Sequence, residues 1–225
     1  DHHGVAALIA ASTLVALMKG EHRLGANQQA RLANINAQLK EFQDAQRPSS
    51  RMPELRPQDL ITDGWYQMGG PLIKASNTRQ LMPFVESIAR RYMGEDAYGR
   101  SIMRLATSLN KVYEVLYNAD CFLDAAELEA LGAALVEMGR EHMRCRQYAD
   151  ALGEPAFQVR PKAHYAQHLH QQARLINPRF TQCYKEESMM GTTSNIYHNT
   201  CNGPIQEDLP TRCAHEVPGG VGDNP

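Results

Sequence analysis

The stretch GVAALIAASTLVALM, residues 4–18, is the longest apolar run in the chain. It has 15 residues, fewer than the roughly 20 that cross a bilayer. Ser12 and Thr13 interrupt its apolar character, and no basic residue precedes it as in a secretion signal. We therefore expect a buried helix over residues 5–19, ending at Gly20, and no membrane span, although a membrane anchor is the alternative.

Downstream of this run, apolar residues recur at the spacing of helices. Steps of three and four place Leu32, Ile35, Leu39 and Phe42 on one face of residues 26–46. The same periodicity predicts a helix over residues 97–118.

Capping residues and prolines predict where the remaining helices begin and end. Asn77 is expected to cap a helix over residues 79–93, with Pro83 near its first turn. Asp124 and Glu127 form an acidic capping box that opens a long helix to about residue 152. Pro161 starts a further helix that Asn177-Pro178 ends near residue 176.

Two segments are too rich in breakers to be helical. Residues 47–57 carry three prolines and two serines, and residues 201–225 are rich in glycine and proline. The sequence thus predicts a mainly α fold. We expect a multi-helix globular domain over residues 1–200, with a Pro-rich crossing loop, followed by an irregular Gly/Pro-rich tail over 201–225.

Charge and cysteine usage limit the class of protein. The 23 basic and 25 acidic side chains nearly cancel, so any nucleic-acid surface must be local. The cysteine number, five, is odd, and no two cysteines form a CxxC pair. We expect free or buried thiols and an intracellular location, while a metal knuckle among Cys183, Cys201 and Cys213 is the alternative.

His164 and His168 are the first candidate metal ligands. They lie four residues apart, which places both imidazoles on one helical face, where they can bind one metal ion. Tyr165 stands where a zincin would have its catalytic glutamate, which disfavours that chemistry. The alternative is a surface or hydrogen-bonding pair.

Glu187, which follows Glu186, is the candidate carboxylate ligand for Mg²⁺ or Mn²⁺. These hard cations prefer oxygen ligands, and phosphoryl transfer uses them in pairs. A second carboxylate is needed, and Asp1 supplies it only if the chain folds back to Glu187. The alternative for the adjacent acids is a solvated helix start.

Basic and aromatic residues surround the same segment and predict a phosphate-backbone site. Tyr165, Phe180 and Tyr184 could stack on bases, and an ordinary solvated face is the alternative. The predicted nucleic-acid-binding side chains are Arg160, Lys162, Arg174, Arg179 and Lys185.

These motifs resemble a signature of transposon-derived, DDE transposase-like proteins that are abundant in dinoflagellate genomes. The opening Asp1-His2-His3-Gly4, followed by a small apolar helix, is similar to their "D-x-x-G" step. The other segments that carry the resemblance are residues 49–55, 63–65, 160–164, 168, 177–180 and 183–192. The similarity spans most of residues 1–200.

The resemblance implies a ribonuclease H-like catalytic core with three carboxylates and two metal ions. Carried over to this sequence, Asp1 matches the aspartate of the opening step, and Glu187 matches the acid before the later "x-x-x-Gly" step. The first catalytic aspartate and most strands would lie upstream, so we expect this portion to be inactive alone and nuclear in the cell.

Two hypotheses follow. The chain is the helical C-terminal part of a DDE-type DNA-processing protein, with DNA as its partner. Alternatively, it is a non-catalytic helical scaffold or accessory subunit of a larger protein assembly, which the near-neutral charge and the Gly/Pro-rich tail favour.

Overall fold

The computed structural model describes residues 2–20, 22–47, 51–69, 75–159 and 168–181, and it confirms the mainly α fold. The compact unit ends at Phe180. The predicted boundary at residue 200 and the predicted tail lie outside the described residues. The helices are α1 (His2–Gly20), α2 (Gln28–Gln46), α3 (Pro57–Leu60), α4 (Ala75–Tyr92), α5 (Ala97–Asn118) and α6 (Ala125–Ala151), with short 3-10 turns η1 (His22–Leu24) and η3 (Pro178–Phe180).

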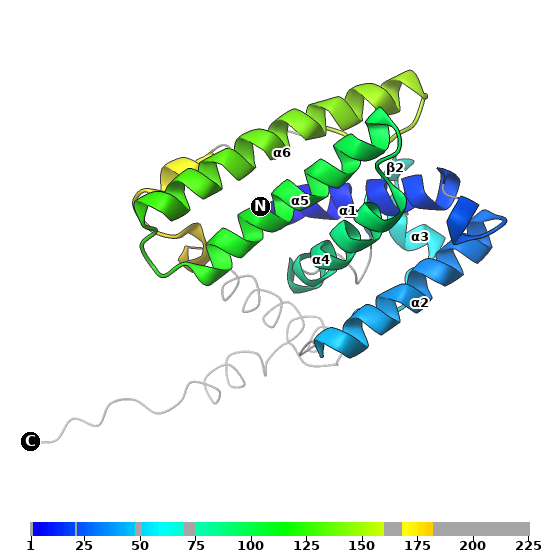
Figure 1. Ribbon diagram of the computed structural model, residues 1–225, viewed down its shortest axis with the longest axis horizontal. Helices are drawn as coiled ribbons and strands as arrows, with labels where there is room; N and C mark the ends of the chain where they lie inside the picture. Colours follow the sequence, from blue (N-terminus) through cyan, green and yellow to red (C-terminus); the bar gives the residue numbers. More distant parts are fainter. Residues whose placement is uncertain (1, 21, 48–50, 70–74, 160–167, 182–225) are drawn as a thin grey trace, which may run out of the picture. The chain divides into compact units, whose positions relative to one another are not determined.

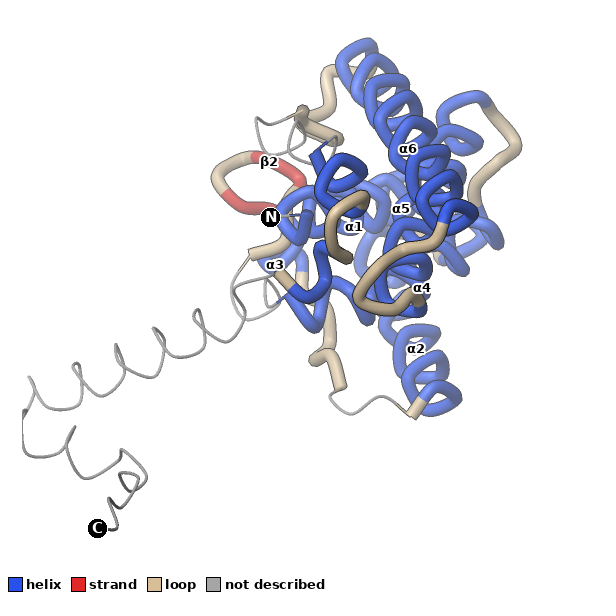
Figure 2. The backbone as a smooth tube through the Cα atoms, turned by 90° about the vertical axis from the view of Figure 1, so that its left-hand side faces the viewer, coloured by secondary structure: helices blue, strands red, loops and turns tan. Residues whose placement is uncertain are grey.

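Helix α1 is the central element of this unit. Every residue from Val5 to Met18 is buried except Ala16, so the predicted buried helix is confirmed. It contacts α2, α3, α4 and α5, and Figures 1 and 2 show these helices arranged around it. None of the helices in the described ranges combines the length and the apolar character that crossing a membrane requires.

Helices α4 and α5 pack against α1 through their apolar faces, and α6 packs against α5. Helix α5 has the predicted bounds, and its predicted stripe from Ile102 to Leu116 is buried. Helix α6 runs antiparallel along α5, to which it makes its main contact (Figure 1). On α2, Leu32, Ile35 and Leu39 are buried as the periodicity predicts.

The Pro-rich crossing loop is ordered in its described part. Asn36 of α2 accepts a hydrogen bond from the Leu55 amide and donates one to the Leu55 carbonyl, each at 2.9 Å. Met52 and Leu55 are buried against the core. Beyond α3, the strands β1 (Ile61–Thr62) and β2 (Trp65–Tyr66) pair antiparallel, with Ile61 opposite Tyr66.

The predicted start of the helix around Pro83 was wrong. Helix α4 begins at Ala75, so Asn77 lies inside it rather than capping it, and Pro83 lies in the helix interior. A proline there has no N–H to donate to the carbonyl four residues earlier. Burial of Leu81, Met82 and Phe84 against the core offsets that loss.

A buried hydroxyl on α1 joins three distant segments. Ser12 accepts a hydrogen bond from the Phe157 amide at 2.9 Å and donates one to the Tyr66 carbonyl at 3.3 Å. Phe157 is fully buried and has a φ of 51°, a left-handed conformation that costs a non-glycine residue free energy. The hydrogen bond to Ser12 helps to hold this turn against the core.

Replacing Ser12 should destabilise the fold far more than replacing its neighbour Thr13. Ser12→Ala leaves the Phe157 amide buried without an acceptor and should cost about 1–3 kcal/mol. The Thr13 hydroxyl is buried and has no partner among the described residues, so the isosteric Thr13→Val should be near neutral or stabilising. Urea unfolding of the two variants measures the difference, and equal losses would contradict the assigned role of Ser12.

The predicted capping box at the start of α6 is confirmed. Asp124 accepts from the Glu127 amide at 2.8 Å, and the Glu127 side chain accepts from the Asp124 amide at 2.9 Å. We expect Asp124→Ala to cost about 1 kcal/mol in thermal unfolding. Asp120→Ala, which removes an exposed carboxylate from the same turn, is the control and should leave stability unchanged.

Candidate functional site

Most of the sequence-predicted site residues lie outside the described residues. His168, Arg174 and Arg179 are the predicted side chains that the structure describes. Those outside it are Asp1, Arg160, Lys162, His164, Lys185 and Glu187. The predicted approach of His164 to Glu187, and the carboxylate pair of Asp1 and Glu187, therefore stay predictions.

His168 lies at the start of the described part of its helix, residues 168–173. It is half-buried, and its Nδ1 lies 3.2 Å from Oε1 of Gln171. Leu169 and Ala173 are buried, so the apolar side of this helix faces the core. Within the described ranges, no group of three His, Cys, Asp or Glu side chains is placed to hold a metal ion.

A buried set of ionisable groups lies on α6, at Glu141, His142 and Cys145. Glu141 is fully buried and accepts a hydrogen bond from Arg144 at 2.6 Å. Burial raises the pKa of the Cys145 thiol, and the neighbouring Glu141 charge raises it further. A nucleophilic cysteine needs a lowered pKa, so Cys145 is a structural thiol. Cys121 and Cys145 are free thiols, and the other three cysteines lie outside the described residues.

His142 is also a structural group. Burial lowers its pKa to about 4, although a hydrogen bond to the backbone of Phe157 opposes this shift. Its Nε2 is buried and has no partner in the described part of the chain. This neutral, mostly buried imidazole stabilises the contact between α6 and the turn at Phe157.

A different set of residues meets at the far end of α5, held there by Asn177. The Asn177 amide group donates to the carbonyls of Leu116 at 2.9 Å and Asp120 at 3.0 Å, and the Asn177 backbone N–H donates to the Cys121 carbonyl at 2.7 Å. The bond to Leu116 satisfies a carbonyl in the last turn of α5, and the other two hold the turn that follows the helix. They also fix η3, which carries Arg179 and Phe180, against the last turn of α5.

Two arginines approach the ring of Tyr117 in this last turn. The guanidinium carbon of Arg79, from α4, lies 4.2 Å from the ring centroid, and that of Arg179 lies 5.1 Å from it. Arg179 also donates to the Tyr117 carbonyl at 2.5 Å and lies 5.1 Å from the centroid of Phe180. We call Arg79, Tyr117, Arg179 and Phe180 the Tyr117 cluster.

The Tyr117 cluster carries positive charge that no described carboxylate neutralises. None of the described acids forms an ion pair with either arginine, although Asp120 lies in the adjoining turn. Glu86, the one carboxylate on α4, is paired with Arg90 at 2.7 Å. Arg174 is exposed and lies five residues before Arg179 in the sequence. The cluster is therefore an electropositive site.

Sequence reasoning found Arg174 and Arg179 but missed Arg79 and Tyr117. Both missed residues lie far from Arg179 in sequence, and each occupies an unremarkable position on an amphipathic helix. The Asn177-Pro178 pair predicts only the end of a helix, whereas the Asn177 amide group makes the hydrogen bonds that position η3. No local pattern in the sequence predicts that these three segments meet.

The burial of His142 predicts a loss of stability in mild acid. Its pKa is about 4 in the folded chain and about 6.5 when unfolded, so the unfolded state binds the extra proton first as the pH falls. Stability should be full above pH ~6.5 and should fall by about 3 kcal/mol toward pH 4. Urea unfolding between these pH values checks this, and His142→Gln should flatten the curve. An unchanged slope would contradict the assignment.

No protein-family model, no curated protein and no solved structure matches this chain. The resemblance to DDE transposase-like proteins thus stays a prediction from the motifs quoted above.

Proposed function

We propose that this chain is a non-catalytic helical domain that binds single-stranded nucleic acid at the Tyr117 cluster. The observation that carries the proposal is the pair of arginines on one tyrosine ring without a carboxylate partner in the described part of the chain. The proposal keeps the predicted partner, DNA, and does not depend on the predicted metal site or on Asp1 and Glu187.

The arginines suit a phosphate backbone. Each guanidinium presents five N–H donors in a planar fork that matches phosphate oxygens. Arg179 has a structural role as well, since a cation at a helix C-terminus favours the helix dipole and its hydrogen bond satisfies the Tyr117 carbonyl. Arg79 makes no hydrogen bond within the described residues, so that structural role does not explain its position.

The exposed Phe180 ring favours single-stranded over double-stranded nucleic acid as the ligand. Its side chain is 53% exposed and lies directly beside the Arg179 guanidinium. Unpaired bases stack on exposed aromatic rings while nearby cations hold the backbone. In a duplex the base faces are already stacked on one another, so Phe180 would gain no partner there.

The near-zero net charge of the chain limits the affinity that we expect for nucleic acid. A chain with a net charge of −2 has no general attraction for polyanions, so binding should depend on this cluster. Arg160, Lys162 and Lys185, which were predicted from sequence to bind nucleic acid, could lengthen the site. We propose modest affinity with a shallow dependence on salt.

An accessory subunit of a protein assembly is the second candidate function. Phe122 and Leu175 are 71% and 77% exposed, and both lie within a few residues of the Asn177 hydrogen bonds that hold Phe180 in place. Exposed large apolar side chains that gather in one place favour a protein partner. The presence or absence of oligonucleotide binding separates the two functions.

Fluorescence anisotropy with a short labelled single-stranded oligonucleotide tests the proposal. We expect the full chain to bind at low salt and the double variant Arg79→Gln, Arg179→Gln to bind about tenfold more weakly. Loss of two phosphate contacts should also reduce the slope of log K against log salt by about 1.4. Phe180→Ala should weaken binding by about tenfold without changing the salt slope.

A charge-matched double variant, Arg91→Gln with Arg100→Gln, serves as the control. Arg91 also lies over a tyrosine ring, at 5.4 Å from Tyr92, but both residues are exposed and outside the cluster. This control should bind like the unaltered chain. If both double variants lose affinity equally, or if no oligonucleotide binds, the accessory-subunit function takes precedence.

A further inference from the structure

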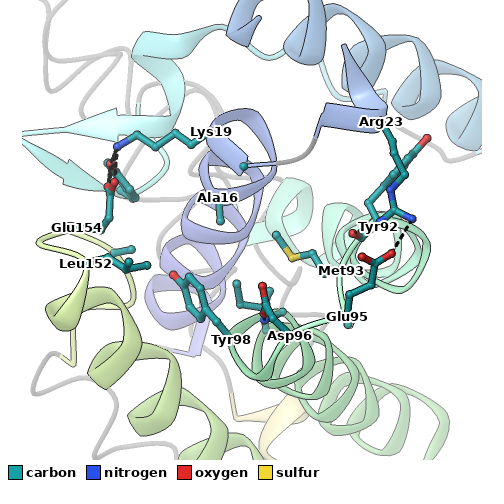
Figure 3. A pocket seen from close by; sticks show the side chains of 16 residues that line it. Ala16, Lys19, Arg23, Tyr92, Met93, Glu95, Asp96, Tyr98, Leu152 and Glu154 are labelled. Carbon is teal, nitrogen blue, oxygen red and sulfur yellow. Dashed lines mark hydrogen bonds and ion pairs between the residues drawn. The ribbon is translucent and has the colours of Figure 1, made fainter. Parts of the chain in front are cut away.

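A cavity of about 640 Å³ opens at the C-terminal end of α1 (Figure 3). Its walls come from α1, from the turn between α4 and α5, from the start of α5 and from the segment that follows α6. Between Val5 and Met18, Ala16 is the one residue of α1 that is not buried, and Ala16 faces this cavity. Between Val5 and Met18, α1 is therefore exposed to solvent only at Ala16.

The floor of the cavity is apolar. It is formed by Ala16, Met93, Ile102, Leu152 and Ala156. Leu152 is 64% exposed, so a ligand here would cover apolar surface that now contacts water. A volume of this size is typical of a site for one small organic molecule.

Each end of the cavity is closed by an ion pair. At one end Lys19 lies 2.6 Å from Glu154, and Tyr66 donates its hydroxyl hydrogen to the same carboxylate. At the other end Arg23 lies 3.2 Å from Glu95, and Figure 3 shows the two pairs on opposite sides. Since each cation already has an acidic partner, an anionic ligand would have to break a pair. Asp96, the remaining acid of the lining, accepts the Gly99 amide as the N-cap of α5.

The charges of Lys19 and Glu154 are fixed at neutral pH. Burial opposes the charged form of both, but their mutual hydrogen bonds and those to Tyr66 outweigh it, so the pKa of Lys19 is raised and the pKa of Glu154 is lowered. Groups whose pKa values move away from neutrality do not act as acid–base catalysts near pH 7. The cavity is thus suited to binding.

Tyr98 supplies the polar group that a ligand can use. Its ring lines the cavity, and Figure 3 shows its hydroxyl directed toward Leu152 and Ala16. No described residue forms a hydrogen bond with that hydroxyl. Burial raises the pKa of Tyr98, so the hydroxyl keeps its proton and is a hydrogen-bond donor.

We propose that this cavity binds a neutral, largely apolar organic molecule whose carbonyl or ether oxygen accepts the hydrogen bond of Tyr98. The apolar floor supplies the binding area, the pairing of both cations disfavours anions, and the Tyr98 hydroxyl orients the ligand. This site is separate from the Tyr117 cluster, and it does not rest on nucleic-acid binding.

Prodan, a neutral naphthalene ketone whose emission shifts to the blue in apolar surroundings, is a suitable probe. We expect saturable one-to-one binding of prodan to the full chain with a blue shift. Tyr98→Phe removes only the hydroxyl and should raise the Kd about fivefold. Tyr148→Phe is the matched control, because Tyr148 packs on Tyr98 at 5.6 Å between ring centroids but does not line the cavity.

A second pair of variants tests the position of the site. A Cβ added at Gly20, which lines the cavity, or at Gly139, which does not, meets no atom within 4 Å, so both positions accept a side chain. Gly20→Trp should raise the Kd for prodan at least tenfold by filling the cavity edge, whereas Gly139→Trp should leave it unchanged.

Three results would overturn the proposal. One is the absence of a blue shift with the unaltered chain. Another is an equal effect of Gly20→Trp and Gly139→Trp. The third is stronger binding of the anionic naphthalene probe 1-anilinonaphthalene-8-sulfonate than of prodan, which would show that the site selects charge rather than a neutral ligand.

Discussion

The burial of one apolar helix on nearly every side is the constraint on which the rest of this structure depends. An amphipathic helix can lie at a surface, but α1 has no polar face to expose, so other elements must surround it. Helices α2, α4 and α5 each present a single apolar stripe, and those stripes face α1 or each other. The fold is therefore a set of one-sided helices assembled around a helix that is apolar all round.

Polar groups on and around α1 fix how its neighbours attach. Ser12 holds the turn at Phe157 and the β2 carbonyl of Tyr66 from the middle of the helix. Arg31 of α2 donates to the carbonyls of Met18 and Lys19, at 2.9 and 2.8 Å, where α1 ends. An apolar helix buried without such partners could rotate or slide in the core, and these directional bonds remove that freedom.

The parts of the fold that the sequence predicted are those that depend on local signals. Apolar periodicity located α5 with its observed bounds, and the Asp124–Glu127 box located the start of α6, because both patterns act within a few residues. The start of α4 was misplaced because tertiary burial carried the helix through Pro83 against a local signal. The Tyr117 cluster and the cavity depend on contacts between segments far apart in sequence. For that reason no local sequence motif identifies Arg79, Tyr98 or Tyr117 as site residues.

The two candidate binding sites lie at opposite ends of α5. Tyr98 lies in its first turn and Tyr117 in its last, so at ~1.5 Å per residue they are separated by roughly 28 Å along the helix axis. No small ligand spans that distance, and the sites share no residue. Any coupling between them would have to pass through movement of α5 against α1, α4 and α6. The close packing of the buried α5 stripe resists such movement, because displacing it would open voids on several helices at once. The two proposed sites should therefore bind their ligands independently, the first through polar contacts with a shallow salt dependence and the second through apolar contacts.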